Sequence, residues 1–188
     1  MQQKMTKIYR ICLIVGILHT ILWGTSLHSS ENDMFYMLPY EQDQAINTLK
    51  SVLKNAQSEI KISIYSFTNN DIAKILRDSA KRGVKISIIF DKESNLKNDT
   101  SVIGYLAKYN NISVCLLSGM RAKNKRYYGI MHQKMAIVDK KILVLGSANW
   151  SKNAFENNFE TLLISHNQRF VQKALQGYEK MTRACVGF

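Results

Sequence analysis

The spacing of apolar residues changes period along the first half of the chain. Over 41–57 apolar side chains recur every three or four positions, which predicts an amphipathic helix. Over 60–67 apolar and polar residues alternate, as in a strand with one face buried. Helical spacing returns over 69–82, where Asn69 or Asn70 is a suitable N-cap. The pattern therefore predicts helix, strand and helix in succession.

The same alternation of elements continues to the C-terminus. Strands are expected over 84–91, 112–117, 135–138, 142–145 and 160–165, a loop and a helix over 95–109, and a final helix over 168–181. Strands separated by helices of this length predict an α/β fold with a largely parallel sheet and helices on its faces. We expect one domain over 38–186.

The first thirty residues differ from the rest. Three basic residues precede an apolar run over 11–23, which is short for a membrane-spanning helix and typical of a signal-peptide core. Residues 1–30 are therefore expected to be either a cleaved signal peptide or a retained N-terminal membrane anchor. The flanking positive charges place the following domain outside the cytoplasm. It would lie on the periplasmic face of the inner membrane if anchored, or be periplasmic or secreted if cleaved.

The charge of the chain is strongly asymmetric. Its 188 residues carry 26 Lys and Arg against 14 Asp and Glu, a net charge of +12. All 14 acids and 23 of the basic residues follow residue 30, so the folded part keeps an excess of nine positive charges. Such an excess favours a polyanionic partner, either nucleic acid or an anionic bilayer. With 46% hydrophobic residues and a single Pro, collagen-like, mucin-like and disordered classes are excluded.

Two cysteines, Cys115 and Cys185, lie outside the leader. In an exported domain they would form a disulfide, and two buried free thiols fit the sequence equally well. No CxxC pair or Cys/His cluster is present, so we expect neither a metal nor another cofactor.

The residues able to take part in a reaction begin with an H-x-K-x4-D motif, formed by His132, Lys134 and Asp139. Alternation along an extended segment places His132 and Lys134 on one face. An imidazole can attack phosphorus or protonate a leaving oxygen near neutral pH. A neighbouring ammonium can neutralise the phosphate oxygens as charge develops. The motif therefore predicts phosphodiester chemistry.

Three residues further along the chain complete the pattern. Ser147 and Asn149 follow a predicted strand in a G-S-x-N sequence and offer neutral donors to the same phosphate. Glu160 opens the next strand, where a carboxylate can hold an imidazole N–H and set its tautomer. Each feature is common alone, but agreement at all these offsets is not.

This combination resembles the phospholipase D superfamily, whose signature is H-x-K-x4-D followed by G-S-x-N. Over about 38–185, and including the upstream sequence of 64–68, the chain is most similar to small bacterial Nuc-type endonucleases, which include membrane-associated NucT-like enzymes. The resemblance implies an α/β/α sandwich on a mixed sheet and a reaction that needs no metal.

The resemblance also assigns roles to residues. It implies that His132 is the catalytic histidine, that Lys134, Ser147 and Asn149 bind the phosphate, and that Glu160 orients an active-site histidine. Asp139 belongs to the same catalytic motif and is expected to support its structure.

Superfamily chemistry uses two such motifs, one histidine forming a phosphohistidine and the other acting as general acid. This chain has one, since His166 lacks the following lysine. Short relatives form a symmetric homodimer, and we expect one here, with both His132 side chains in one shared site.

A basic and aromatic segment lies directly upstream of the motif. It comprises Arg121, Lys123, Lys125, Arg126, Tyr127 and Tyr128. Cationic side chains would contact several phosphates and tyrosines would stack on unpaired bases. The segment favours nucleic acid, with DNA, preferably single-stranded, or RNA as substrate. Two alternatives stay open: a phospholipase D or cardiolipin hydrolase, and a membrane-tethered nucleic-acid-binding module without catalysis. Processing during DNA uptake and nutrient scavenging are both compatible roles.

Overall fold

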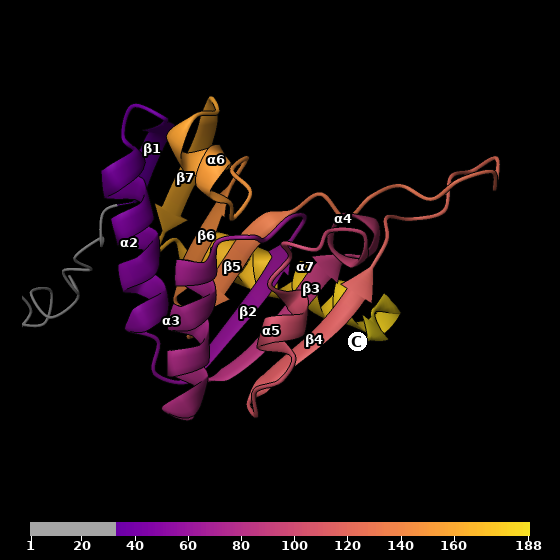
Figure 1. Ribbon diagram of the computed structural model, residues 1–188, viewed down its shortest axis with the longest axis horizontal. Coiled ribbons are helices and arrows are strands. Elements are labelled where there is room, and N and C mark those ends of the chain that lie inside the picture. Colours follow the sequence, from indigo (N-terminus) through magenta and orange to yellow (C-terminus); the bar gives the residue numbers. More distant parts are fainter. Residues whose placement is uncertain (1–32) are drawn as a thin grey trace, which may run out of the picture. The chain divides into compact units, whose positions relative to one another are not determined.

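The computed structural model describes residues 33–188, which belong to one compact unit over Asn32–Phe188 (Figure 1). The strands are β1 (Met34–Leu38), β2 (Glu59–Ile64), β3 (Lys85–Asp91), β4 (Ile112–Leu117), β5 (Lys134–Val138), β6 (Ile142–Gly146), β7 (Glu160–Ser165) and β8 (Val186–Gly187). The helices are α2 (Gln42–Lys54), α3 (Asn70–Lys81), α4 (Lys92–Leu96), α5 (Ile103–Leu106), α6 (Lys152–Glu156) and α7 (Gln168–Ala184). The leader expected over 1–30 lies outside the described residues.

A single sheet is covered on both faces, which confirms the expected α/β/α sandwich. Alternate residues of each central strand point to opposite faces. On one face Ile88, Ala136 and Val144 join a core beneath α2 and α3. On the other face, Ile89 and Ile137 form a second core with three residues of α7, which are Val171, Leu175 and Tyr178. In Figure 1, α2, α3 and α5 lie in front of the sheet and α7 behind it.

The sheet is mixed, as expected, but it is less parallel than the element order predicts. Its strand order is β1-β7-β6-β5-β2-β3-β4-β8. Among the described strands, the β2–β3 and β3–β4 pairs are parallel and every other pair is antiparallel. One source of the difference is the connection between β5 and β6, because only residues 139–141 separate them and so short a connection joins antiparallel neighbours.

The predicted strands and long helices are present, with ends that differ by about three residues or fewer. Asn69 caps α3 by accepting the backbone N–H groups of Asp71 and Ile72, and Gly83 follows that helix at φ 100°. The sequence pattern does not predict β1, α4, α6 or β8. β1 is apolar throughout and shows no alternation, α4 and α6 make little more than one helical turn, and β8 has two residues. The folded unit therefore begins before residue 38, with β1 paired to β7.

The mixed sheet brings several strand ends to one edge, called the catalytic edge below. β2, β3 and β4 all end there, and so does β6. β5 and β7 run in the opposite direction and begin there. Residues just after β2 and β6 and those around the starts of β5 and β7 thus become neighbours.

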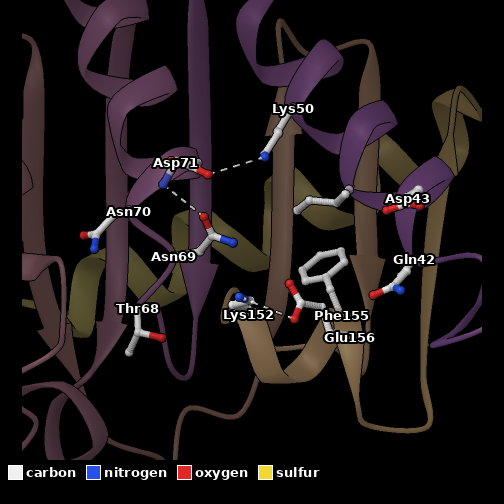
Figure 2. A pocket seen from close by; sticks show the side chains of 11 residues that line it. Gln42, Asp43, Lys50, Thr68, Asn69, Asn70, Asp71, Lys152, Phe155 and Glu156 are labelled. Carbon is white, nitrogen blue, oxygen red and sulfur yellow. Dashed lines mark hydrogen bonds and ion pairs between the residues drawn. The ribbon is translucent and has the colours of Figure 1, made fainter.

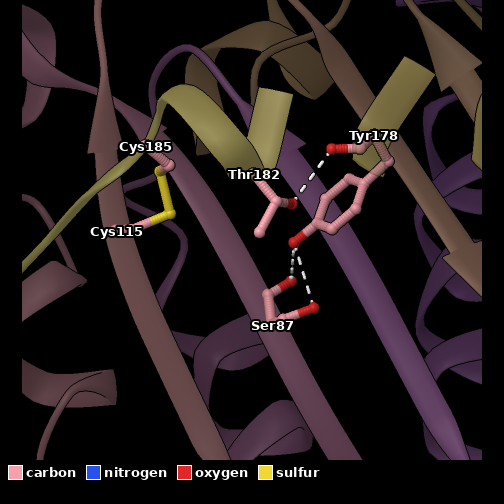
Figure 3. The surroundings of a disulfide bond; sticks show 5 residues. All are labelled: Ser87, Cys115, Tyr178, Thr182 and Cys185. Carbon is pink, nitrogen blue, oxygen red and sulfur yellow. Dashed lines mark hydrogen bonds between the residues drawn. A yellow bond between two sulfur atoms is a disulfide. The ribbon is translucent and has the colours of Figure 1, made fainter. Parts of the chain in front are cut away.

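Cys115 and Cys185 form a disulfide (Figure 3), which resolves the two possibilities left open by the sequence. The bond joins β4 to the end of α7. Directly beyond it β8 pairs with β4, and the Phe188 backbone N–H donates to the Val114 carbonyl at 3.2 Å. Nearby, the Tyr178 hydroxyl donates to the Ser87 carbonyl at 2.8 Å. The second core is therefore fastened at the C-terminal end of α7.

Removing this disulfide is expected to destabilise the domain while leaving its fold intact. Because the two cysteines are 70 residues apart, the cross-link restricts a long loop in the unfolded chain, and its loss should cost about 2–4 kcal/mol. The measurement is urea unfolding of wild type and of Cys115→Ala/Cys185→Ala, each with and without reductant. Reductant should destabilise only the wild type. An equal response from both proteins would show that the two thiols are not joined.

Candidate active site

His132 lies at the catalytic edge, immediately before β5 rather than within it. Its side chain is exposed, and its ring contacts the Tyr65 ring edge-on, with centroids 4.5 Å apart. The backbone pairing of β2 and β5 continues one step beyond the strands, because the Tyr65 N–H donates to the Gln133 carbonyl at 2.8 Å. The histidine is thus held on a fixed backbone with its ring accessible to substrate.

Lys134, the first residue of β5, is almost fully buried, with 6% exposure. Its Nζ donates to the His132 carbonyl at 3.0 Å and lies 5.0 Å from the centroid of the Tyr65 ring. Desolvation by burial lowers the pKa of Lys134, and the negative charge of Glu160 opposes that change. A partly desolvated ammonium interacts strongly with an entering phosphate. The predicted phosphate-binding role of Lys134 fits this environment.

Ser147 and Asn149 follow the end of β6 at the same edge. The Ser147 Oγ accepts the Thr161 N–H at 2.9 Å, which leaves the hydroxyl proton free to be donated. The Oδ1 of Asn149 is buried and has no hydrogen-bond donor among residues 33–188. A buried acceptor without a partner is costly and is typical of a site that another molecule completes.

Glu160 begins β7, two strands away from β5, a lateral separation of about 10 Å. Its Oε1 accepts the Asn158 amide at 3.5 Å. Within the described part of one chain, no hydrogen bond joins Glu160 to His132. The expected pairing of this carboxylate with a histidine is therefore not made inside a single copy.

Asp139 does not belong to the catalytic edge, because it follows the far end of β5. Its carboxylate accepts the backbone N–H groups of Gln57, Ser58 and Glu59 at 2.8–3.0 Å and the Ser58 hydroxyl at 2.8 Å. Burial alone would raise the pKa of Asp139, but these donors together lower it. Its place among the catalytic residues is thus corrected: the last position of the motif fastens the loop before β2.

Sequence reasoning missed Tyr65, which contacts both His132 and Lys134. It also missed Asp91, at the end of β3, which is 1% exposed. One Asp91 oxygen accepts the Met131 N–H at 2.9 Å, and the other accepts the Ser94 N–H at 3.0 Å. Asp91 thereby holds the residue next to His132. A polar residue ending a run of buried strand residues was the available signal.

The carbonyl of Tyr65 is fixed by the same group of residues. It accepts the Asn95 amide at 2.7 Å and the Ser94 hydroxyl. The Asn95 Oδ1 in turn accepts the Ser101 hydroxyl at 2.9 Å. These hydrogen bonds hold the backbone of Tyr65, and Asp91 holds the backbone of Met131. Both segments next to the His132 ring are therefore fixed.

The predicted basic segment forms a projecting arm over 118–130 between β4 and β5 (Figure 1). Its two sides pair through Gly119 N–H to Gly129 carbonyl at 2.7 Å and Gly129 N–H to Met120 carbonyl at 2.9 Å. Gly119 is required there, since a Cβ would meet the Gly129 backbone at 2.2 Å. All six predicted nucleic-acid-binding residues of the arm are exposed.

A separate pocket of about 420 Å³ lies between α2, the start of α3 and α6 (Figure 2). It contains none of the predicted site residues. Its charged lining comprises Asp43, Lys50, Asp71, Lys152 and Glu156. Three acids against two bases do not favour a polyanion, and Figure 2 shows lysines directed to acids, Lys50 to Asp71 and Lys152 to Glu156, each at 3.8 Å. This pocket is not the phosphate site.

Fold and site together define a hydrolase of the phospholipase D superfamily. A family model described as "Cardiolipin synthase, PLD-like domain" matches residues 49–182, and the chain belongs to this phospholipase D-like family. The chain is also of the Nuc type. Its structure matches that of NucT from Helicobacter pylori with a TM-score of 0.81 and 54% identity, covering 84% of this chain and 99% of NucT.

Two further proteins resemble this chain, one in fold and one in sequence. Nuc from Salmonella typhimurium, a phospholipase D family member, has the same fold, with a TM-score of 0.71, 24% identity and coverage of 84% and 97% of the two chains. The mitochondrial cardiolipin hydrolase of Mus musculus is 30% identical over 144 residues, 77% of this chain and 60% of its own length. The chain thus spans between half and three fifths of the mammalian relatives that it matches.

Asp91, which ends β3, and Asp139, which follows β5, provide a matched pair of variants. Asp91→Asn should lower kcat for a small chromogenic phosphodiester at least tenfold with little change in KM, because the backbone beside His132 loses its acceptor. Asp139→Asn should lower the free energy of unfolding by about 2 kcal/mol and leave kcat per folded molecule unchanged. Urea unfolding and steady-state kinetics on both proteins test this. Equal kcat losses in the two variants would contradict a positioning role for Asp91.

Proposed function

We propose that this protein is a nuclease that hydrolyses nucleic acid, preferably single-stranded DNA, with RNA as a further substrate. The observation that carries the proposal is the basic arm beside a phosphodiesterase site. Arg121, Lys123, Lys125 and Arg126 offer positive charge to several phosphates in sequence. A phospholipid headgroup presents far fewer phosphates than this row of cations is suited to bind.

The two tyrosines of the arm favour a substrate with unpaired bases. Tyr127 and Tyr128 are 63% and 61% exposed, and the Arg121 guanidinium lies 5.9 Å from the centroid of the Tyr128 ring. Exposed aromatic rings stack on bases that are free of a complementary strand. The arm thus binds backbone and base together, a combination that suits a single strand.

In the proposed reaction, an unprotonated ring nitrogen of His132 attacks phosphorus. A P–N bond forms as the P–O bond to the leaving oxygen breaks, and a second protonated histidine gives its proton to that oxygen. The second histidine then takes a proton from water, which attacks phosphorus and breaks the P–N bond. Lys134, Ser147 and Asn149 stabilise the charge on the phosphate oxygens. No step requires a metal.

The second histidine comes from a second copy, so we propose a homodimer with one shared site. One chain carries a single motif, its Glu160 makes no bond to its own His132 among the described residues, and Asn149 Oδ1 lacks a donor. Beside Glu160, the Phe159 and Tyr40 rings are 79% and 77% exposed with centroids 6.0 Å apart. Exposed aromatic side chains of this kind are common in interfaces between copies.

Cardiolipin hydrolysis is the second candidate, favoured by the name of the mammalian relatives. It uses the same chemistry, so substrate preference decides between the two. The third possibility, a module that only binds nucleic acid, requires a damaged site, whereas His132 and Lys134 are in place with Tyr65 between them.

The proposed location is outside the cytoplasm, in the periplasm or on the outer face of the inner membrane. The Cys115–Cys185 disulfide supports this, since such bonds persist in oxidising compartments. In residues 33–188 no helix is long and apolar enough to span a bilayer. DNA uptake and nutrient scavenging are the proposed roles.

Cleavage by the wild type is expected to persist in EDTA and to favour single-stranded DNA over duplex DNA and cardiolipin vesicles. His132→Ala should lose turnover by orders of magnitude while still binding DNA, because binding depends on the arm. The control His166→Ala should remain active.

Neutralising the four arm cations should reduce the slope of log K for DNA binding against log salt concentration, by roughly one or slightly less per lost contact. Stronger activity on cardiolipin than on DNA would reverse the proposed substrate.

The dimer makes a quantitative prediction for mixtures. When wild type and His132→Ala are exchanged in equal amounts, about a quarter of the dimers keep two histidines, and activity per total dimer should fall to roughly that fraction. Steady-state rates across mixing ratios measure it, with sedimentation to confirm exchange. A fall to only one half, or a fully active monomer, would eliminate the shared site.

A further inference from the structure

The face of the sheet on which α7 packs is incompletely covered. Met34, Tyr36 and Leu38 of β1 pack toward α2, which places Phe35 and Met37 on the opposite face, the face of α7. α7 packs against β5 and β6. Phe35 and Met37 therefore stay 57% and 49% exposed. Together with Phe170, which is 51% exposed at the start of α7, they form the apolar part of what we call the rear face.

The outer side of α7 forms the charged part of the rear face. Arg169, Lys173, Lys180 and Arg183 are all exposed. Their spacing of four, seven and three residues aligns them along one side of the helix. The opposite side carries the buried residues Val171, Leu175 and Tyr178. Glu179 is the one acid of this helix. The rear face therefore combines a row of positive charges with a few exposed apolar side chains.

The polypeptide enters the domain beside this face. Asp33, the first described residue, accepts the His166 N–H at 2.9 Å, and α7 begins at Gln168. The apolar leader run ends at residue 23. The intervening ten or so residues span at most about 35 Å when extended. If the leader is held in a bilayer, the start of β1 can therefore lie no further than about 35 Å along the chain from the lipid.

We propose that the rear face docks on the surface of an anionic phospholipid bilayer. The row on α7 meets the negative headgroups, and Phe35, Met37 and Phe170 enter the interface between headgroups and acyl chains. This interaction is separate from catalysis, because α7 covers the face of the sheet opposite α2 and α3, whereas the active site occupies an edge. The proposal rests on the proposed location outside the cytoplasm but not on the proposed substrate.

The test uses residues 33–188, a compact unit with its own cores, so that the leader does not itself bind lipid. Flotation is measured with phosphatidylcholine vesicles and with vesicles that also contain phosphatidylglycerol. Binding is expected only to the anionic vesicles and should weaken with salt. Arg169→Gln/Lys173→Gln/Lys180→Gln should reduce it roughly hundredfold, at about fivefold per charge. Phe35→Ser/Met37→Ser should also reduce it.

A variant with the same charge change supplies the control. Arg121→Gln/Lys123→Gln/Lys125→Gln on the arm should keep vesicle binding and lose DNA affinity, whereas the α7 variant should do the reverse. Equal binding to neutral and anionic vesicles would overturn the proposal. So would loss of DNA affinity in the α7 variant, which would make the row a nucleic-acid track, or dissociation of a dimer by the Phe35/Met37 variant. Since flotation requires no turnover, a failed nuclease assay leaves this result interpretable.

Discussion

The antiparallel pairing of β2 with β5 is the contact on which the site depends. It joins the parallel part of the sheet, β2 to β4, to the antiparallel part that runs from β5 to β1. It continues beyond the strands through the Tyr65 N–H and the Gln133 carbonyl. Tyr65 is thereby placed against His132 and Lys134. A shift of one residue in this register would turn His132 and Lys134 together to the other face of the sheet.

Carboxylates fasten both ends of this arrangement by the same physical means. Asp139 accepts backbone N–H groups at the end of the sheet remote from the site, and Asp91 accepts them at the catalytic edge. Neither makes a salt bridge in the described part of the chain. Backbone donors point in fixed directions, so a carboxylate bonded to them positions a loop more precisely than an ion pair with a flexible lysine would. Rigid supports of this kind would suit the exposed His132 in its proposed role as nucleophile.

Positive charge is distributed over separate surfaces rather than spread evenly. The arm carries cations and aromatic rings beside the catalytic edge, and α7 carries a row of cations on the rear face. The disulfide connects the two regions, because Cys115 lies in the strand that leads to the arm and Cys185 ends α7. Under the two proposals made above, one small domain would bind two polyanions, a nucleic acid and a lipid surface, on separate surfaces.

The sequence alone determined the class of fold and the chemistry of the site. Periodicity is a local property, so it located the long elements, and the offsets of His132, Lys134, Ser147, Asn149 and Glu160 identified the superfamily. The direction of strand pairing, the buried network of Asp91 and the remote place of Asp139 came only from tertiary structure. The contacts of Asp91 with Met131 and of Asp139 with Ser58 join residues 40 and 81 positions apart in the chain. A periodic pattern cannot encode such partners, because it records only which face is buried, not what covers it.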